Sequence, residues 1–249
     1  MAIGILGADS DTRITYPQIV STATQAIAPH KLQFWGRYFK KDSLDDAHYS
    51  KQETPTFQKN AYSLLCFARE TPDVGGCSDD GRQWATWNVD AFFSEISAQH
   101  VIKAAACGEL LFFLDVEPTC DISKEFYSAW SATLMAHSSQ KTEGKVKFMP
   151  GVYLNGSENK DSIRILNDVC NSGGVCSGLI VAYYPGHTPP EAPVDWDLSK
   201  LGLSDLTSIP VLAWQYAGDR PPNEHLDYIQ VNPDPNLEKF FLRRLITPG

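Results

Sequence analysis

One apolar segment that ends in two acids constrains the fold of this chain more than any other. Five large apolar residues, 110–114, run directly into Asp115 and Glu117, and Pro118 follows. An uninterrupted apolar run of this length is typical of a strand covered on both faces, as in the parallel sheet of an α/β protein. The segment therefore predicts a buried strand that carries charge only at its carboxyl end.

The spacing of these two acids suggests a chemistry. Side chains two residues apart on a strand point to the same side, about 6 to 7 Å apart, so Asp115 and Glu117 are expected to share one face. Neighbouring carboxyl groups above an apolar floor have pKa values that are driven apart, which suits acid-assisted cleavage of a glycosidic bond. The alternative is a pair of solvated acids that cap a helix or bind a lysine.

Length and charge narrow the class of protein. The 249 residues match the length of a single α/β barrel, and we expect one β/α barrel domain over 1–249. The formal charge of −9 disfavours nucleic acid and anionic membranes as main partners, because both need a basic surface. No apolar segment approaches the ~20 residues that span a bilayer.

The first predicted strand begins at Ile3, so no signal peptide is visible. Either a leader has been removed, or the protein is cytoplasmic, or it is exported by a route that needs none. The six cysteines show no Cys-x-x-Cys spacing, which disfavours a zinc site. Cys170 and Cys176 flank a flexible loop that would let them meet in a disulfide, and six buried free thiols are the alternative.

Apolar runs and helical patterns alternate along the chain. Eight strands are predicted, over residues 3–9, 32–39, 62–69, 110–117, 146–154, 178–184, 210–216 and 226–231. Helices are predicted up to residue 27 and over 84–106, 123–135, 159–170 and 237–245, with loops over 71–82 and 185–196 and a weak helical region over 198–206. This order predicts a (β/α)₈ TIM-type barrel with irregular or missing helices in its second half.

In such barrels, chemistry gathers where the strands end. That rule brings together Asp9, Arg37 with Tyr38, Asp115 with Glu117, Tyr153 with Asn155, Tyr183 with Tyr184, and Trp214 with Gln215 and Tyr216. The site is expected to be acidic in the middle and aromatic at the rim, which favours a carbohydrate. Asp9 could instead cap a helix, Arg37 could be a salt-bridge partner or a surface charge, and Trp214 and Tyr216 could be core aromatics on the face opposite Gln215.

Several of these pieces resemble the family-25 glycoside hydrolases, lysozymes of the N-acetylmuramidase type with a β/α barrel. The matching pieces are Asp9 and residues 114–117, 151–153, 181–185 and 213–216. The pair Arg37 and Tyr38 is similar to a sister group of glycoside-hydrolase-like barrels of uncertain activity. The resemblance spans nearly the whole chain and consists of short motifs.

The resemblance implies that Glu117 is the general acid, and that Asp115 and Asp9 position the 2-acetamido group of the substrate or stabilise positive charge. Substrate contacts are expected from Arg37, Tyr38, Tyr153, Tyr183, Trp214, Gln215 and Tyr216. The family usually has an aspartate on its last strand. Here Gln230 stands at that place, unless Asp227 or Asp234 replaces it through a shift in the loop.

The expected function is therefore a muramidase that acts on peptidoglycan without a metal or organic cofactor. Delivery to the cell envelope or periplasm as an antibacterial effector would imply an immunity or adaptor protein as partner. Two alternatives stay open. One is a barrel that binds a glycan or another partner without cleaving it. The other is a chitinase-like enzyme, which Phe113 disfavours because an acid is usual at that position.

Overall fold

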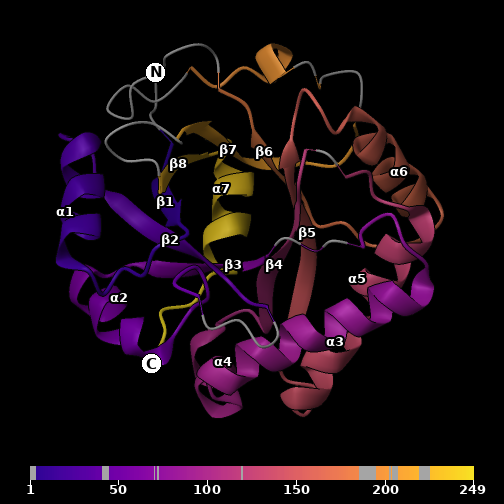
Figure 1. The fold of residues 1–249 in the computed structure, drawn as a ribbon, viewed down its shortest axis with the longest axis horizontal. Coiled ribbons are helices and arrows are strands. Elements are labelled where there is room, and N and C mark those ends of the chain that lie inside the picture. The colour runs from indigo at the N-terminus through magenta and orange to yellow at the C-terminus, as the bar shows by residue number, and fades with distance from the viewer. Residues whose placement is uncertain are drawn as a thin grey trace.

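The strands of this chain close into one barrel. The computed structural model describes residues 4–40, 45–69, 71, 73–118, 120–184, 195–201, 203, 207–218 and 225–249. Its eight strands neighbour one another in chain order around the ring (Figure 1). They are β1 (Leu6–Ser10), β2 (Leu32–Tyr38), β3 (Ser63–Ala68), β4 (Glu109–Val116), β5 (Lys147–Asn155), β6 (Leu179–Ala182), β7 (Val211–Ala217) and β8 (Leu226–Val231). The predicted α/β barrel is confirmed.

The last strand runs against the others. β1 to β7 are parallel to their neighbours in the series, whereas β8 pairs antiparallel with both β1 and β7. In the β1–β8 register Asp9 lies opposite Asp227 and Leu6 lies opposite Gln230. We call the end at which β1–β7 finish and β8 begins the upper end of the barrel. At this end the last strand therefore contributes its first residues.

Helices surround the barrel. The ring outside the strands consists of α1 (Pro17–Ala26), α2 (Thr54–Asn60), α3 (Ser78–Glu95), α4 (Ala98–Ala104), α5 (Lys124–Lys141) and α6 (Lys160–Asn171) (Figure 1). Short 3₁₀ turns lie at η1 (Lys51–Glu53) and η2 (Leu198–Leu201), and α7 (Pro235–Leu242) lies across the centre of the ring. Among the described residues beyond β6, only η2 and α7 are helical, which confirms the predicted irregularity of the second half.

Some local predictions were wrong. The single helix expected over 84–106 is two helices, because Ser97 interrupts it and accepts a hydrogen bond from the backbone N–H of His100 at 3.2 Å as the N-cap of α4. The loop expected over 71–82 is shorter, since α3 begins at Ser78, and η1 and α2 were missed. Residues 1–3, 185–194, 202 and 204–206, which belong to other predicted segments, lie outside the described residues.

Apolar side chains fill the barrel as well as the layer between barrel and helices. The interior cluster contains Phe34, Leu65, Phe67, Leu111, Phe113, Ile180, Ile229 and Val231. Helix α7 closes the lower end, where the ring of Phe241 lies 5.4 Å from that of Phe34. The chain after α7 continues this closure, because the carbonyl of Arg244 accepts from the N–H of Leu111 at 2.9 Å. The lower end is therefore plugged, and polar groups gather at the upper end.

Two other sequence expectations can be compared with the structure. All six cysteines are free thiols, so the alternative with a disulfide between Cys170 and Cys176 does not hold. None of the described helices combines the length and the apolarity that crossing a bilayer requires.

The predicted start of α5 allows a stability test. Ser123 Oγ accepts from the backbone N–H of Phe126 at 3.0 Å and so caps the helix. Replacing Ser123 by alanine is expected to lower the free energy of unfolding by about 1 kcal/mol, because a helix-start N–H loses its partner. Urea unfolding followed by circular dichroism measures the change. Ser128→Ala, inside the same helix, is the control, and an equal loss in both variants would contradict a capping role.

Candidate active site

Three aspartates from different strands meet at the upper end of the barrel. Asp9 ends β1 and is 2% exposed, Asp115 lies near the end of β4 and is 5% exposed, and Asp227 lies at the start of β8. Phe113 and Ile229 point into the barrel as members of the interior cluster. Asp115 lies two residues after Phe113 and Asp227 two residues before Ile229, so both aspartates point inward as well. Burial raises the pKa of the Tyr38 hydroxyl, and the charges of all three carboxyl groups raise it further, which indicates that all three lie near this hydroxyl.

Glu117 lies just beyond β4 and is exposed, unlike these aspartates. Its backbone is held by Asn159, a fully buried residue at the start of α6, whose Nδ2 donates to the carbonyls of Glu117 at 3.3 Å and Cys120 at 3.0 Å. Asn159 is itself oriented by the N–H of Asn155, which donates to its Oδ1 at 3.0 Å. A hydrogen-bonded turn therefore carries the exposed Glu117 two residues after the buried Asp115.

Asp9 accepts two hydrogen bonds, one on each oxygen. Tyr38 Oη donates to Oδ1 at 3.1 Å, and Gln215 Nε2 donates to Oδ2 at 3.0 Å. Burial raises the pKa of Asp9 to about 6, while the bonds from Gln215 and Tyr38 and the charge of Arg37 oppose this increase. The carboxyl group is therefore poised to change its protonation state just below neutral pH.

This raised pKa predicts a pH-dependent stability. The folded protein keeps the Asp9 proton up to a pH of about 6, whereas the unfolded chain releases it near 3.8. Between these values the folded state binds more protons, so stability falls as pH rises. Relative to an Asp9→Asn variant, the wild type is expected to lose about 2 kcal/mol of unfolding free energy between pH 4 and pH 7. Urea unfolding across this range measures it, and a constant difference would contradict the shift.

The two tyrosines of the interior remain protonated. Burial is the largest cause that raises the pKa of Tyr38 and of Tyr153 well above the usual value, and nearby aspartate charges add to it in both cases. The rings of Tyr153 and Tyr38 pack against Phe67 at 5.7 and 5.5 Å. Both hydroxyls are therefore hydrogen-bond donors above an apolar floor.

Arg37 does not face this site. Its guanidinium is completely buried outside the barrel interior, where Nε lies 3.0 Å from Oε2 of Glu53, which is also fully buried. It also donates to backbone carbonyls of Ser10, Thr12 and His48. Adjacent residues of a strand point to opposite faces, so Tyr38 inside the barrel requires Arg37 outside. The expected placement of Arg37 at the mouth is wrong.

Three aromatic residues predicted to contact the substrate also lie outside the barrel interior. Trp214 and Tyr216 are fully buried in the layer between barrel and helices, and the half-buried Tyr183 packs against Trp214 at 6.3 Å. Their strand neighbours Gln215 and Tyr184 reach the site instead, since Tyr184 Oη donates to Gln215 Oε1 at 2.6 Å. Tyr184 is 36% exposed and is an aromatic residue at the rim among the residues that the structure describes.

Asp227 is the acid of the last strand that lies at the upper end of the barrel. Gln230 pairs with Leu6 and Trp214, both in the outer layer, so its side chain lies outside the barrel. Asp234 caps α7, where Oδ1 accepts from the N–H groups of Asn236 and Leu237 at 2.9 and 3.1 Å. Because β8 is antiparallel, the acid at the upper end is found at its first residues. The alternative that Asp227 replaces Gln230 therefore has the geometry in its favour.

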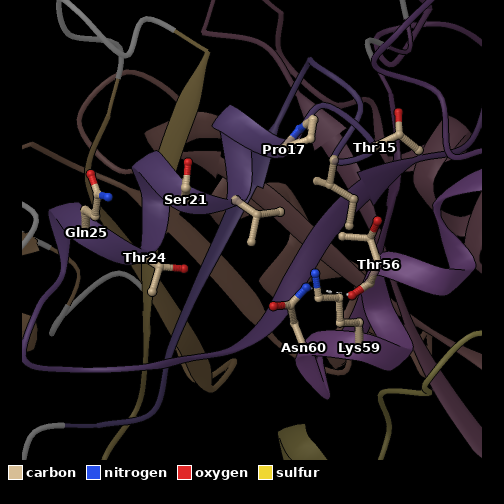
Figure 2. A pocket seen from close by; sticks show the side chains of 10 residues that line it. Thr15, Pro17, Ser21, Thr24, Gln25, Thr56, Lys59 and Asn60 are labelled. Carbon is tan, nitrogen blue, oxygen red and sulfur yellow. Dashed lines mark hydrogen bonds between the residues drawn. The ribbon is translucent and has the colours of Figure 1, made fainter.

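A separate hollow of about 460 Å³ lies between α1 and α2 on the outer wall (Figure 2). Figure 2 shows hydroxyl and amide side chains around it, with one cation, Lys59, and no carboxyl group. It lacks acid–base partners and does not adjoin the carboxyl cluster. Among the residues that the structure describes, no group of three or more His, Cys, Asp or Glu side chains is placed to hold a metal ion.

No protein-family model and no curated protein sequence matches the chain. Solved structures do match. An uncharacterized protein of B. stearothermophilus has a TM-score of 0.63 at 18% identity, covering 97% of this chain and 100% of that one. A family GH25 lysozyme from Aspergillus fumigatus has a TM-score of 0.50 at 14% identity, covering 94% and 98%.

The fold is a GH25-like barrel. A Tat-secreted protein of Mycobacterium tuberculosis is also similar, with a TM-score of 0.52 at 13% identity over 94% of this chain and 97% of that one. At these identities the likeness concerns the fold, and the chemistry must be argued from the side chains. The acidic side chains at or just beyond the strand ends of this GH25-like barrel include Asp9, Asp115, Glu117 and Asp227.

Proposed function

We propose that this chain is a peptidoglycan-degrading glycoside hydrolase of the N-acetylmuramidase type, which cleaves a β-1,4 bond of the glycan strand. The observation that carries the proposal is the contrast among four carboxyl groups at the upper end of a GH25-like barrel. Asp9 and Asp115 are buried, Asp227 lies beside them, and Glu117 is exposed on a hydrogen-bonded turn. One exposed acid next to buried anionic groups suits a reaction in which positive charge develops on a sugar.

In this mechanism Glu117 donates its proton to the leaving oxygen while the bond from that oxygen to the anomeric carbon breaks. The carbonyl oxygen of the substrate's own 2-acetamido group forms the new bond to the anomeric carbon. Asp115 or Asp9 accepts a hydrogen bond from the acetamido N–H and stabilises the positive charge of the cyclic intermediate. Water then attacks the anomeric carbon as the bond from that carbon to the acetamido oxygen breaks, and the Glu117 carboxylate takes a proton from the water, so configuration is retained.

The remaining groups bind and shape the sugar. The half-buried Tyr38 and Tyr153 are protonated donors beside the carboxyl groups. Tyr184 supplies an aromatic ring at the rim, which can pack against the apolar face of a pyranose. No step needs a metal or organic cofactor, because proton transfer and charge stabilisation both come from side chains.

The substrate places the reaction outside the cytoplasm, in the envelope or periplasm. The similarity to a Tat-secreted protein of Mycobacterium tuberculosis supports such a location. We further propose that the protein is delivered there as an antibacterial effector, with an immunity or adaptor protein as its partner.

Fragment analysis tests the proposal. Purified peptidoglycan is incubated with the protein, and the released fragments are reduced with borohydride and identified by mass spectrometry. Disaccharide-peptides that end in muramitol are expected, and a Glu117→Gln protein purified in parallel controls for contaminating hydrolases. Fragments that end in reduced glucosamine would move the cut to the other glycosidic bond. Retention on the insoluble polymer without any fragments would support a binding barrel instead.

A further inference from the structure

Gln215 links the buried part of the site to its rim through one amide. Its Oε1 accepts from Tyr153 Oη and from Tyr184 Oη, each at 2.6 Å, and its Nε2 donates to Asp9 Oδ2 at 3.0 Å. Two hydroxyl donors need the carbonyl oxygen, and an ionised carboxylate needs a donor. The reversed amide would place oxygen against oxygen, so the network selects a single orientation.

We propose that Gln215 is a positioning residue, which orients the carboxylate of Asp9 and anchors the rim residue Tyr184 with the same amide group. The inference rests on the proposed function and deepens it. Gln215 is 1% exposed, so it acts through its neighbours and not by touching the sugar. An amino-sugar that binds at the rim therefore meets a ring whose position depends on the same amide that orients the carboxylate of Asp9.

The link to Gln215 matters because Tyr184 lies at the rim, where a sugar could bind. Its hydroxyl is bound inward by Gln215, and the residue is 36% exposed. A tyrosine held by its hydroxyl loses little further freedom on binding, so its ring is a preorganised platform for a sugar. Without Gln215, the ring would lose this anchor and Asp9 would lose one of its two donors.

Other groups around Asp9 also influence its proton. Those that act electrostatically on Asp9, or together with it on Tyr38 and Tyr153, come from four strands (β2, β4, β5 and β8) and from the loops after β1 and β6: Asp11, Arg37, Tyr38, Asp115, Tyr153, Tyr184 and Asp227. Only Tyr38 and Gln215 are shown donating a hydrogen bond to Asp9 among the described residues. Gln215→Met therefore removes one of two bonds and leaves the charges in place.

Two substitutions separate the two halves of the link. Gln215→Met keeps the volume but makes no hydrogen bond, whereas Gln215→Glu keeps an acceptor for both tyrosines and loses the donor to Asp9. The pKa of Asp9 is read from the ¹³C carboxyl signal that disappears in Asp9→Asn. Both variants are expected to raise it above the value of about 6. Gln230→Met, at a buried glutamine outside the barrel, is the matched control and should leave it unchanged.

The rim is tested by binding in a Glu117→Gln background. A soluble tetrasaccharide of alternating N-acetylglucosamine and N-acetylmuramic acid is titrated by calorimetry. Gln215→Met and Tyr184→Ala are each expected to weaken binding about 10-fold, which corresponds to about 1.4 kcal/mol. The double variant should lose little more, because both changes remove the same platform. Gln215→Glu should bind more tightly than Gln215→Met.

The outcomes distinguish this inference from the function on which it rests. An unchanged Asp9 pKa in both Gln215 variants, or additive losses of binding, would overturn the positioning role. A raised Asp9 pKa in a protein whose wild type neither binds nor cleaves the glycan would overturn the muramidase and leave the Gln215–Asp9 coupling intact. Circular dichroism confirms that each variant is folded before it is titrated.

Discussion

Replacing Glu117 by glutamine is expected to lower the rate of peptidoglycan cleavage by about 10²- to 10⁴-fold. Glutamine has nearly the same size as glutamate but cannot give a proton to the leaving oxygen. The turn that carries Glu117 is held through its backbone carbonyl by Asn159, a bond that the substitution leaves in place. The loss should therefore appear in the rate and not in folding. Release of reducing ends from purified peptidoglycan measures it.

The matched control for this experiment is Glu143→Gln. Glu143 is an exposed glutamate that precedes β5, at the opposite end of the barrel. The same chemical change there should leave the rate unchanged. If Glu117→Gln cleaves as fast as the control, the exposed carboxyl group is not the acid, and the proton would have to come from one of the aspartates.

Replacing Glu53 by glutamine is expected to lower the free energy of unfolding by about 3–5 kcal/mol, because it leaves the guanidinium of Arg37 buried without its counter-ion. The pair is fully buried on both sides. Glu53 also accepts from the backbone N–H groups of Ile14 at 3.1 Å and Ser50 at 2.9 Å. Arg37 in turn binds the carbonyl of Ser10, which follows Asp9. The pair therefore also braces the loop beside the site.

A double-mutant cycle assigns this loss to the pair. Arg37→Met is expected to be destabilising as well, and Arg37→Met with Glu53→Gln should lose less than the two single changes together, since neither then leaves a buried charge. Urea unfolding followed by fluorescence gives all the values. The exposed pair of Arg82 and Asp79 is the control, and Asp79→Asn should hardly change stability. Simple additivity at Arg37 and Glu53 would contradict the assignment.

The alternation of apolar and polar residues predicted much of this structure. The run from Leu110 to Leu114 is a central strand buried on both faces, as expected. Ser123 caps a helix where its sequence context predicts one. The period of two along a strand also separated Gln215 from Trp214 and Tyr216. These features depend on neighbours within one element, so the sequence suffices for them.

The two-residue period of a strand does not reveal which of its two faces points into the barrel. Arg37 and Tyr38 both stand at the end of β2, and only closure of the barrel directs Tyr38 inward and Arg37 toward Glu53. The choice between Tyr183 and Tyr184 at the rim has the same origin. Glu53 was not predicted at all, because its partner lies on a different element and nothing in its own surroundings indicates burial.

The sequence by itself determined the class of fold, the strand that carries Asp115 and the helix cap at Ser123, because each follows from local periodicity and local hydrogen bonding. Only the tertiary structure decided the direction of β8. A two-residue period reads the same in both directions, so the sequence led to Gln230 at the carboxyl end of the last strand. Antiparallel pairing with β1 turns that strand over and sets Asp227 opposite Asp9.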